Sequence, residues 1–172
     1  MDGTRPFHGE LSAEQIKKDS VPEAVAIYQD TIDAIKAHFW ARDWDSLLSC
    51  IAIPNRISAL DAARVFNSHE EWLNVTRAAR TCFADQGVTE YHRICGGAFF
   101  TDADKQEITG FHETYILRGS ALAAPRFKGY MQMVLRDGRW QSAGLHTDQR
   151  DTVFPTIYAD RLVPAMDPRP TP

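Results

Sequence analysis

Two ionisable residues, His146 and Asp148, lie two positions apart at the end of a stretch in which apolar and polar residues alternate. In a β-strand, residues two apart project to the same face. The carboxylate could therefore orient the imidazole or raise its pKa, which would suit a general base. The alternative is that both residues lie at a fraying sheet end, where they cap backbone groups or are solvated.

A third candidate acid or base is His112, within the stretch Gly-Phe-His-Glu-Thr-Tyr at residues 110–115. Strand alternation places it on one face with Gly110, Thr114 and Ile116. If this face is concave, His112 meets His146 across a cavity and the two imidazoles could share a proton transfer. The alternative is a hydrogen-bonded core or interface histidine.

These ionisable residues do not form a recognisable metal-binding motif. The set His112, Glu113, His146 and Asp148 lacks the His-x-His or His-x-x-x-His spacing that is typical of metal ligands. We therefore predict His112, His146 and Asp148 as catalytic candidates, with no metal and no cofactor.

The stretch at residues 127–148 consists of two alternating runs joined by Asp137-Gly138, which predicts a β-hairpin with a type I′ turn. A two-residue turn would place Met131 opposite Gly144 and Gly129 opposite His146. His146 would then share one face with bulky apolar side chains and with glycines that leave space, which is typical of a pocket. The expected pocket residues are Tyr91, Phe127, Met131, Met133 and Trp140.

Helical patterns occupy the first half of the chain. Ser20 is expected to cap a helix over residues 21–41, Asp43 to open a shorter helix that Pro54 ends, and Ser68 to cap a third helix that ends at Gly87. An extended piece is expected near residues 56–60. Strand patterns follow at residues 88–100, 107–118, 126–136 and 139–148, and their short connections predict an antiparallel meander.

The pattern predicts one domain over residues 20–150. Residues 1–19 are expected to form an N-terminal arm, although Ser12 to Gln15 has the form of a capping box. Residues 151–172 are rich in proline near the C-terminus and are expected to form an extended tail.

Composition excludes several classes of protein. The 172 residues are 44% hydrophobic, which suits one core, and the net charge of −4 gives no basic surface for nucleic acid. The three cysteines are widely spaced and resemble reduced core residues, so a cytoplasmic location is expected. No signal sequence and no run of roughly 20 apolar residues is present, so no membrane association is expected.

Three sequence segments resemble the nuclear-transport-factor-2-like (NTF2-like, cystatin-like) fold: Ala-Arg-Asp-Trp-Asp-Ser-Leu-Leu at 41–48, Val-Phe-Asn-Ser-His-Glu-Glu-Trp at 65–72 and Leu-Arg-Asp-Gly-Arg-Trp at 135–140. The resemblance implies an α+β cone, in which three N-terminal helices pack on a strongly curved antiparallel sheet around an apolar cavity. It also implies a homodimer. The family includes ketosteroid isomerases, scytalone dehydratase and polyketide cyclases, as well as proteins that only bind or assemble.

Against the ketosteroid isomerases, Asp61 is the nearest counterpart of the general base, so the resemblance adds it to the expected ligand-binding residues. The alternative for Asp61 is a turn residue that hydrogen-bonds local backbone. We expect a cofactor-free isomerase, dehydratase or cyclase that acts on a small apolar or oxygenated molecule. The alternatives are a non-catalytic ligand-binding or dimeric protein and an accessory subunit.

Overall fold

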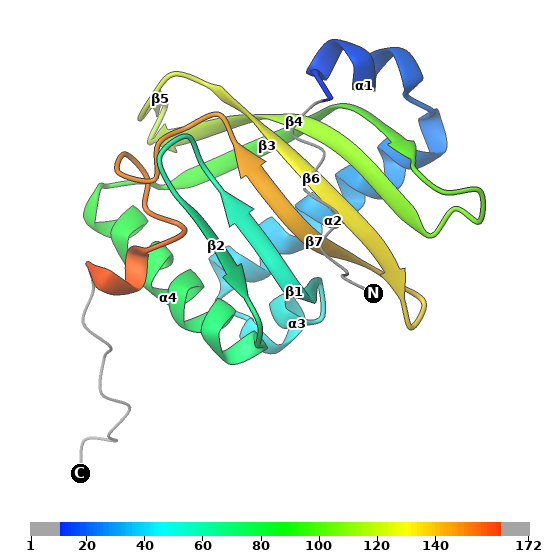
Figure 1. Ribbon diagram of the computed structural model, residues 1–172. Helices are drawn as coiled ribbons and strands as arrows, with labels where there is room; N and C mark the ends of the chain where they lie inside the picture. Colours follow the sequence, from blue (N-terminus) through cyan, green and yellow to red (C-terminus); the bar gives the residue numbers. More distant parts are fainter. Residues whose placement is uncertain (1–10, 163–172) are drawn as a thin grey trace.

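The computed structural model describes residues 11–162, which form helices packed against one curved sheet (Figure 1). The helices are α1 (Ala13–Asp19), α2 (Pro22–Ala41), α3 (Trp44–Leu48), α4 (His69–Asp85) and the 3-10 helix η1 (Ala159–Arg161). The strands are β1 (Ile51–Ser58), β2 (Ala63–Phe66), β3 (Glu90–Phe100), β4 (Glu107–Arg118), β5 (Ala121–Leu122), β6 (Phe127–Arg136) and β7 (Arg139–Thr147).

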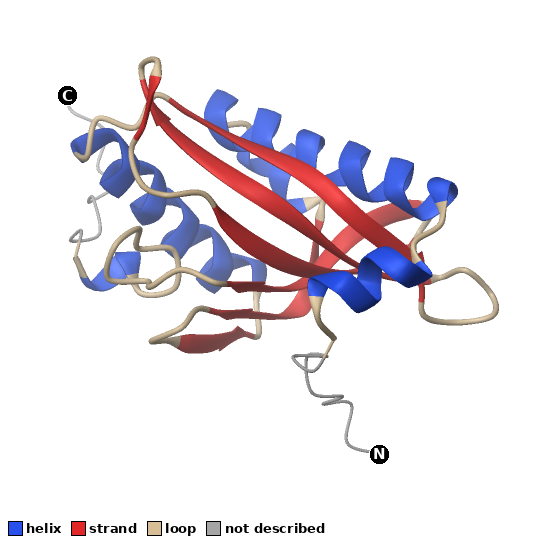
Figure 2. Ribbon diagram, turned by 90° about the horizontal axis from the view of Figure 1, so that it is seen from above, coloured by secondary structure: helices blue, strands red, loops and turns tan. Residues whose placement is uncertain are grey.

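The strands pair in the order β2-β1-β7-β6-β4-β3, and β5 pairs with β4. Neighbouring strands from β3 to β7 are antiparallel, which confirms the predicted meander, but β1 pairs with β7 in parallel, so the sheet is mixed. Figure 2 shows the strands as one twisted layer with the longest helix, α2, running along it. The α+β class that the sequence predicts is therefore confirmed.

The first long helix begins differently from the prediction. Its N-cap is Val21, and the hydroxyl of Ser20 instead accepts a hydrogen bond from the backbone N–H of Ala98 in β3. The backbone N–H of Val21 also donates to the carbonyl of Ala98. Ser20 therefore fixes the start of α2 to the sheet rather than capping the helix.

Pro54 does not end a helix, because α3 ends at Leu48 and Pro54 lies within β1. The pairing of β1 with β7 changes register between Ile51 and Arg56, and Pro54 lies in this interval. An irregular part of a strand tolerates proline, since no ladder hydrogen bond is required from its nitrogen.

The hairpin between β6 and β7 has the predicted turn, with positive φ angles at Asp137 (52°) and Gly138 (74°). Its predicted register holds from the turn to the pair Met133–Ser142. A bulge then adds one residue to β7, so Tyr130 pairs with His146 and Gly129 pairs with Thr147. The predicted pairing of Gly129 with His146 is therefore wrong, and His146 moves to the opposite face.

Helix α1 and helix α2 lie on opposite faces of the sheet. Gly97 pairs with Phe111, and a Cβ atom at Gly97 would lie 3.1 Å from the backbone of Lys17 in α1. His112, the next residue after Phe111, contacts Tyr28 of α2. Residues of the expected N-terminal arm thus cover part of the outer face, where Ile16 is only 1% exposed.

The expected C-terminal tail also packs on the domain in its described part. Phe154, Ile157 and Ala159 are buried, and η1 lies beside α4. We call residues 149–161 the cap segment. The proline-rich end at residues 163–172 lies outside the described residues.

Candidate functional site

A cavity of about 170 Å³ lies between the concave face of the sheet, helices α2 and α4, and the cap segment. Its walls are mainly apolar. The apolar lining residues include Ile35, Phe39, Trp72, Ala79, Phe83, Tyr91, Ile116, Phe127, Leu145 and Phe154. The polar lining residues include Thr76, Arg93, His112, Thr114, Thr147, Arg150 and Asp151. A space of this size suits one ring with a small substituent, because an apolar cavity of roughly 150 Å³ accommodates benzene.

His112 lies at the inner wall of the cavity and is 1% exposed. Its Nδ1 atom is 2.7 Å from the hydroxyl oxygen of Tyr28, which is fully buried on α2. Burial, assisted by the nearby charge of Arg93, holds the pKa of His112 well below its usual value. The imidazole is therefore neutral at physiological pH.

The hydrogen bond to Tyr28 selects one tautomer of this neutral imidazole. Burial, together with the nearby Cys95, raises the pKa of Tyr28 well above its usual value, so the phenol keeps its proton. The Tyr28 hydroxyl makes its one hydrogen bond among the described residues to Nδ1 of His112, so its proton has no other acceptor there. The protonated phenol therefore donates to Nδ1 of His112, and the remaining imidazole proton resides on Nε2.

Two glycines make room for the pair formed by Tyr28 and His112. A Cβ atom at Gly110 would lie 2.5 Å from the Tyr28 ring, and a Cβ atom at Gly129 would overlap Nε2 of His112. Gly129 is paired with His112 across β4 and β6. The absence of side chains at these two positions therefore leaves the space that the Tyr28 ring and the imidazole occupy.

Arg93, on β3, brings a positive charge to the cavity lining. Its Nη2 donates to the carbonyl of Ile32 at 3.1 Å, and its guanidinium carbon lies 5.3 Å from the centre of the Tyr91 ring. Its Nε is buried and has no hydrogen-bond partner within residues 11–162. No described carboxylate lies within ion-pair distance of Arg93, in contrast to Arg64, whose Nη1 contacts both oxygens of Asp160.

Asp61 does not line the cavity but holds the cap segment in place. Its carboxylate accepts hydrogen bonds from the backbone N–H of Asp151 at 2.6 Å and from the hydroxyl of Thr152 at 2.9 Å. Burial acts to raise the Asp61 pKa, but these hydrogen bonds lower it overall. Asp61 was expected to contact a ligand, but in the structure it joins the β1–β2 turn to the cap segment.

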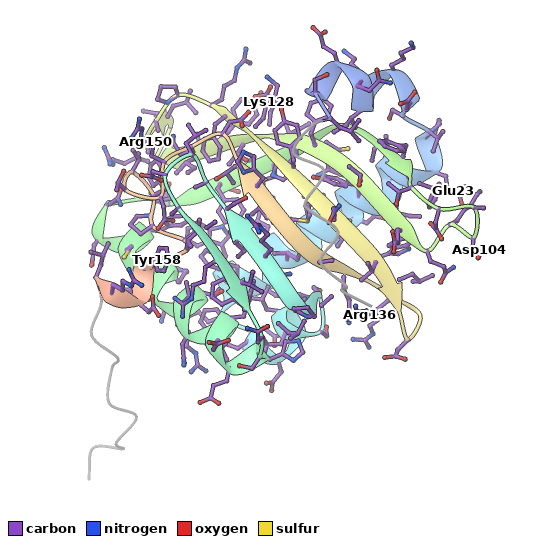
Figure 3. The ribbon with its side chains drawn as sticks, viewed as in Figure 1. Glu23, Asp104, Lys128, Arg136, Arg150 and Tyr158 are labelled. Carbon is purple, nitrogen blue, oxygen red and sulfur yellow. The ribbon has the colours of Figure 1, made fainter. Side chains whose placement is uncertain are left out.

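Asp151 organises the cap segment from within. Its Oδ1 accepts hydrogen bonds from the backbone N–H groups of Thr156 and Ile157, and its Oδ2 accepts from that of Tyr158. The Tyr158 hydroxyl in turn donates to the carbonyl of Ala63 in β2. Figure 3 shows Arg150 and Tyr158 on the side of the molecule where this segment lies.

We expect D151N to lower the free energy of unfolding by about 1–3 kcal/mol. The amide nitrogen of the asparagine would face a backbone N–H whose hydrogen bond the Asp151 carboxylate now accepts. Hydrogen exchange should accelerate at the amides of Thr156, Ile157 and Tyr158 before it changes in the sheet. D137N is the matched control, since Asn is well tolerated at the positive φ of this exposed turn. Equal exchange in D151N and wild type would contradict this role.

His146 lies on the outer face of the sheet, away from His112. His146 pairs with Tyr130, and Tyr130 pairs with Phe111, whose side chain projects opposite to that of His112. The Nδ1 of His146 lies 2.9 Å from the Ser58 hydroxyl oxygen, and its Nε2 lies 3.5 Å from Oδ1 of Asp148. The predicted contact with Asp148 is present, but the two histidines do not meet across one cavity.

The expected pocket residues divide between two clusters. Tyr91 and Phe127 line the cavity. Met131 and Met133 pack instead with Tyr28 and Ile32 in a second core cluster, and Trp140 packs against it. His112 contacts Tyr28 of this second cluster and also lines the cavity, whereas neither methionine is among the cavity-lining residues.

Sequence reasoning did not select Arg93, Tyr28 or the cap segment as parts of this site. One signal was available for Arg93, since it alternates with Tyr91 and Cys95 along a strand and is the only charged member of that set. Glycine at position 144, next to the extra residue of β7, is a frequent marker of a bulge.

No protein-family model matches the chain, and no curated protein matches it in sequence. Solved structures do resemble it. They include an NTF2-like protein of unknown function from Shewanella oneidensis MR-1 (TM-score 0.56, 11% identity, 72% of this chain and 98% of that one). An NTF2-like protein of unknown function from Pseudomonas putida KT2440 has a TM-score of 0.54 at 11% identity, covering 75% of this chain and 88% of that one.

A third similar structure is a domain of unknown function with a cystatin-like fold from Nostoc punctiforme (TM-score 0.55, 9% identity, 76% of this chain and 80% of that one). The chain therefore has the NTF2-like, or cystatin-like, fold that its sequence resembles. At these identities the likeness concerns the fold alone.

No helix within residues 11–162 is both long and apolar enough to cross a membrane.

Proposed function

We propose that the protein binds a small, largely apolar, oxygen-bearing molecule in the cavity beside His112. The observation that carries this proposal is a neutral imidazole, fixed in one tautomer by Tyr28, at the wall of an otherwise apolar cavity. Its Nε2–H is a donor suited to a carbonyl or hydroxyl oxygen. The apolar walls would contact the rest of the ligand.

Titration with benzamide, a neutral molecule of one ring and one carbonyl, tests this proposal. We expect saturable amide chemical-shift changes at Tyr91, Thr114 and Leu145, with a dissociation constant of about 1 mM or below. A79L would fill part of the cavity from α4 and should weaken binding about tenfold. A84L, on the exposed side of the same helix, is the control. Changes that do not saturate, or that A79L leaves unaltered, would count against the proposal.

A second candidate function is cofactor-free catalysis, as an isomerase, dehydratase or cyclase. It is favoured by the same imidazole, because a neutral histidine can polarise a substrate carbonyl. Full proton donation from Nε2 would draw the Tyr28 proton to Nδ1 and leave a buried phenolate, which the raised pKa of Tyr28 opposes. Ligand binding is therefore the better-supported proposal, and His146 with Asp148 on the outer face is not part of either.

A homodimer and a cytoplasmic location remain predictions. The expected dimer would use the outer sheet face near Glu113 and Tyr115, part of which α1 leaves uncovered. Sedimentation should give twice the mass of one chain, whereas a monomer at high concentration would contradict the dimer.

A further inference from the structure

The inner wall of the cavity carries a cation, Arg93, that forms no ion pair with a carboxylate of residues 11–162. Arg93 donates through Nη2 to the carbonyl of Ile32, while its buried Nε makes no hydrogen bond with any part of the chain that the structure describes. A buried donor left unsatisfied costs about 1–3 kcal/mol, more when it is charged. This arrangement therefore favours a ligand that supplies the missing acceptor.

The nearest candidate for an internal counterion is already occupied. Asp151 is the carboxylate that lines the cavity, and three backbone N–H groups of the cap segment satisfy it. It forms no ion pair with Arg93 among the described residues. The other ionisable groups on the lining are the exposed Arg150, the neutral His112, and Tyr91, whose phenol stays protonated because burial raises its pKa. The cavity is thus positive in a chain whose net charge is −4.

A second residue on the cavity lining, Trp72, also favours a ligand that supplies a hydrogen-bond acceptor. It lines the cavity from α4, is 7% exposed, and its indole Nε1–H has no hydrogen-bond partner within residues 11–162. Two buried donors without acceptors on the lining of one cavity indicate that the missing group is an acceptor. An oxyanion provides several acceptor sites, whereas an alcohol or amide provides fewer.

We propose that the ligand is a small apolar carboxylic acid, of about the size of a single ring, whose carboxylate pairs with the Arg93 guanidinium. This proposal rests on the proposed binding function and names its ligand class. Arginine presents two planar forks that match the two oxygens of a carboxylate, Nε with Nη2 and Nη1 with Nη2, and Nη2 carries a second hydrogen besides the one donated to Ile32. The Tyr91 ring beneath the guanidinium and its bond to Ile32 hold these forks in position.

The test compares benzoate with benzamide, which have the same ring and nearly the same shape. By calorimetry and amide chemical shifts at neutral pH and low salt, we expect wild type to bind benzoate about tenfold or more tightly than benzamide. R93Q should remove that preference while retaining benzamide binding. R93K keeps the charge but not the fork, so it should retain only part of the preference. R139Q, at the exposed start of β7, should bind both compounds as wild type does.

The outcomes separate this proposal from the binding function on which it rests. If wild type binds both compounds equally in the cavity, the carboxylate proposal is overturned and the binding function stands. If neither compound binds there, the binding function fails. If R93Q keeps the full preference for benzoate, Arg93 is not the anchor. The comparison in wild type decides the ligand class even if R93Q does not fold.

Discussion

Replacing Gly129 with alanine is expected to lower the free energy of unfolding by about 1–3 kcal/mol, because the new methyl group would overlap Nε2 of His112. The imidazole has no simple way to move, since Tyr28 holds its other nitrogen and the Tyr28 ring is itself packed against Gly110. Urea unfolding of wild type and G129A measures the effect.

The control for this prediction is the same substitution in an H112A background. Without the imidazole, the added methyl group has space, so G129A should then cost less than about 0.5 kcal/mol. An equal cost in both backgrounds would show that His112 is not what the glycine accommodates. The double-mutant cycle thus isolates this one contact from the general cost of changing a strand residue.

The second large effect expected is a loss of stability in mild acid that depends on His112. Its pKa is lowered in the folded protein, while in the unfolded chain it returns to about 6.5. The unfolded state therefore binds one more proton below about pH 6.5, and the contribution of this residue to stability falls with decreasing pH. The slope can reach about 1.4 kcal/mol per pH unit, until the pH reaches the folded pKa.

Chemical unfolding of wild type and H112Q between about pH 7.5 and pH 5 measures this slope. The difference in stability between the two proteins should shrink as the pH falls, because the glutamine side chain of the variant does not titrate. The ¹⁵N shifts of the His112 ring in wild type should stay those of a neutral imidazole with its proton on Nε2. Parallel stability curves, or a protonated ring near pH 6, would contradict the assignment of a buried neutral histidine.

Local sequence signals predicted much of the fold. Asp137-Gly138 forms the expected turn because both positions adopt positive φ, and Ser68 caps α4 by accepting from the N–H of Glu71. These features depend on a few neighbouring residues. The parallel pairing of β1 with β7 depends on residues about 90 apart, such as Ser58 and His146, and no local pattern encodes it.

The candidate site was predictable only in part for the same reason. The alternation of β4 correctly grouped His112 with Thr114 and Ile116, but it could not say which face is concave. The single-residue bulge in β7 then reversed the face of His146, since strand side chains alternate with a period of two. Arg93 became a candidate only once the fold showed that no carboxylate of residues 11–162 lies within ion-pair distance of it.

The crystal structure of a complex with 4-bromobenzoate tests the central claim most directly, because bromine can be located by its anomalous scattering. The account predicts one anomalous peak inside the cavity between α2, α4 and the sheet, with the carboxylate within hydrogen-bonding distance of Arg93 and the ring against the apolar wall near Phe83. A bromine peak only on the outer face near His146, with no ligand density beside His112, would contradict it.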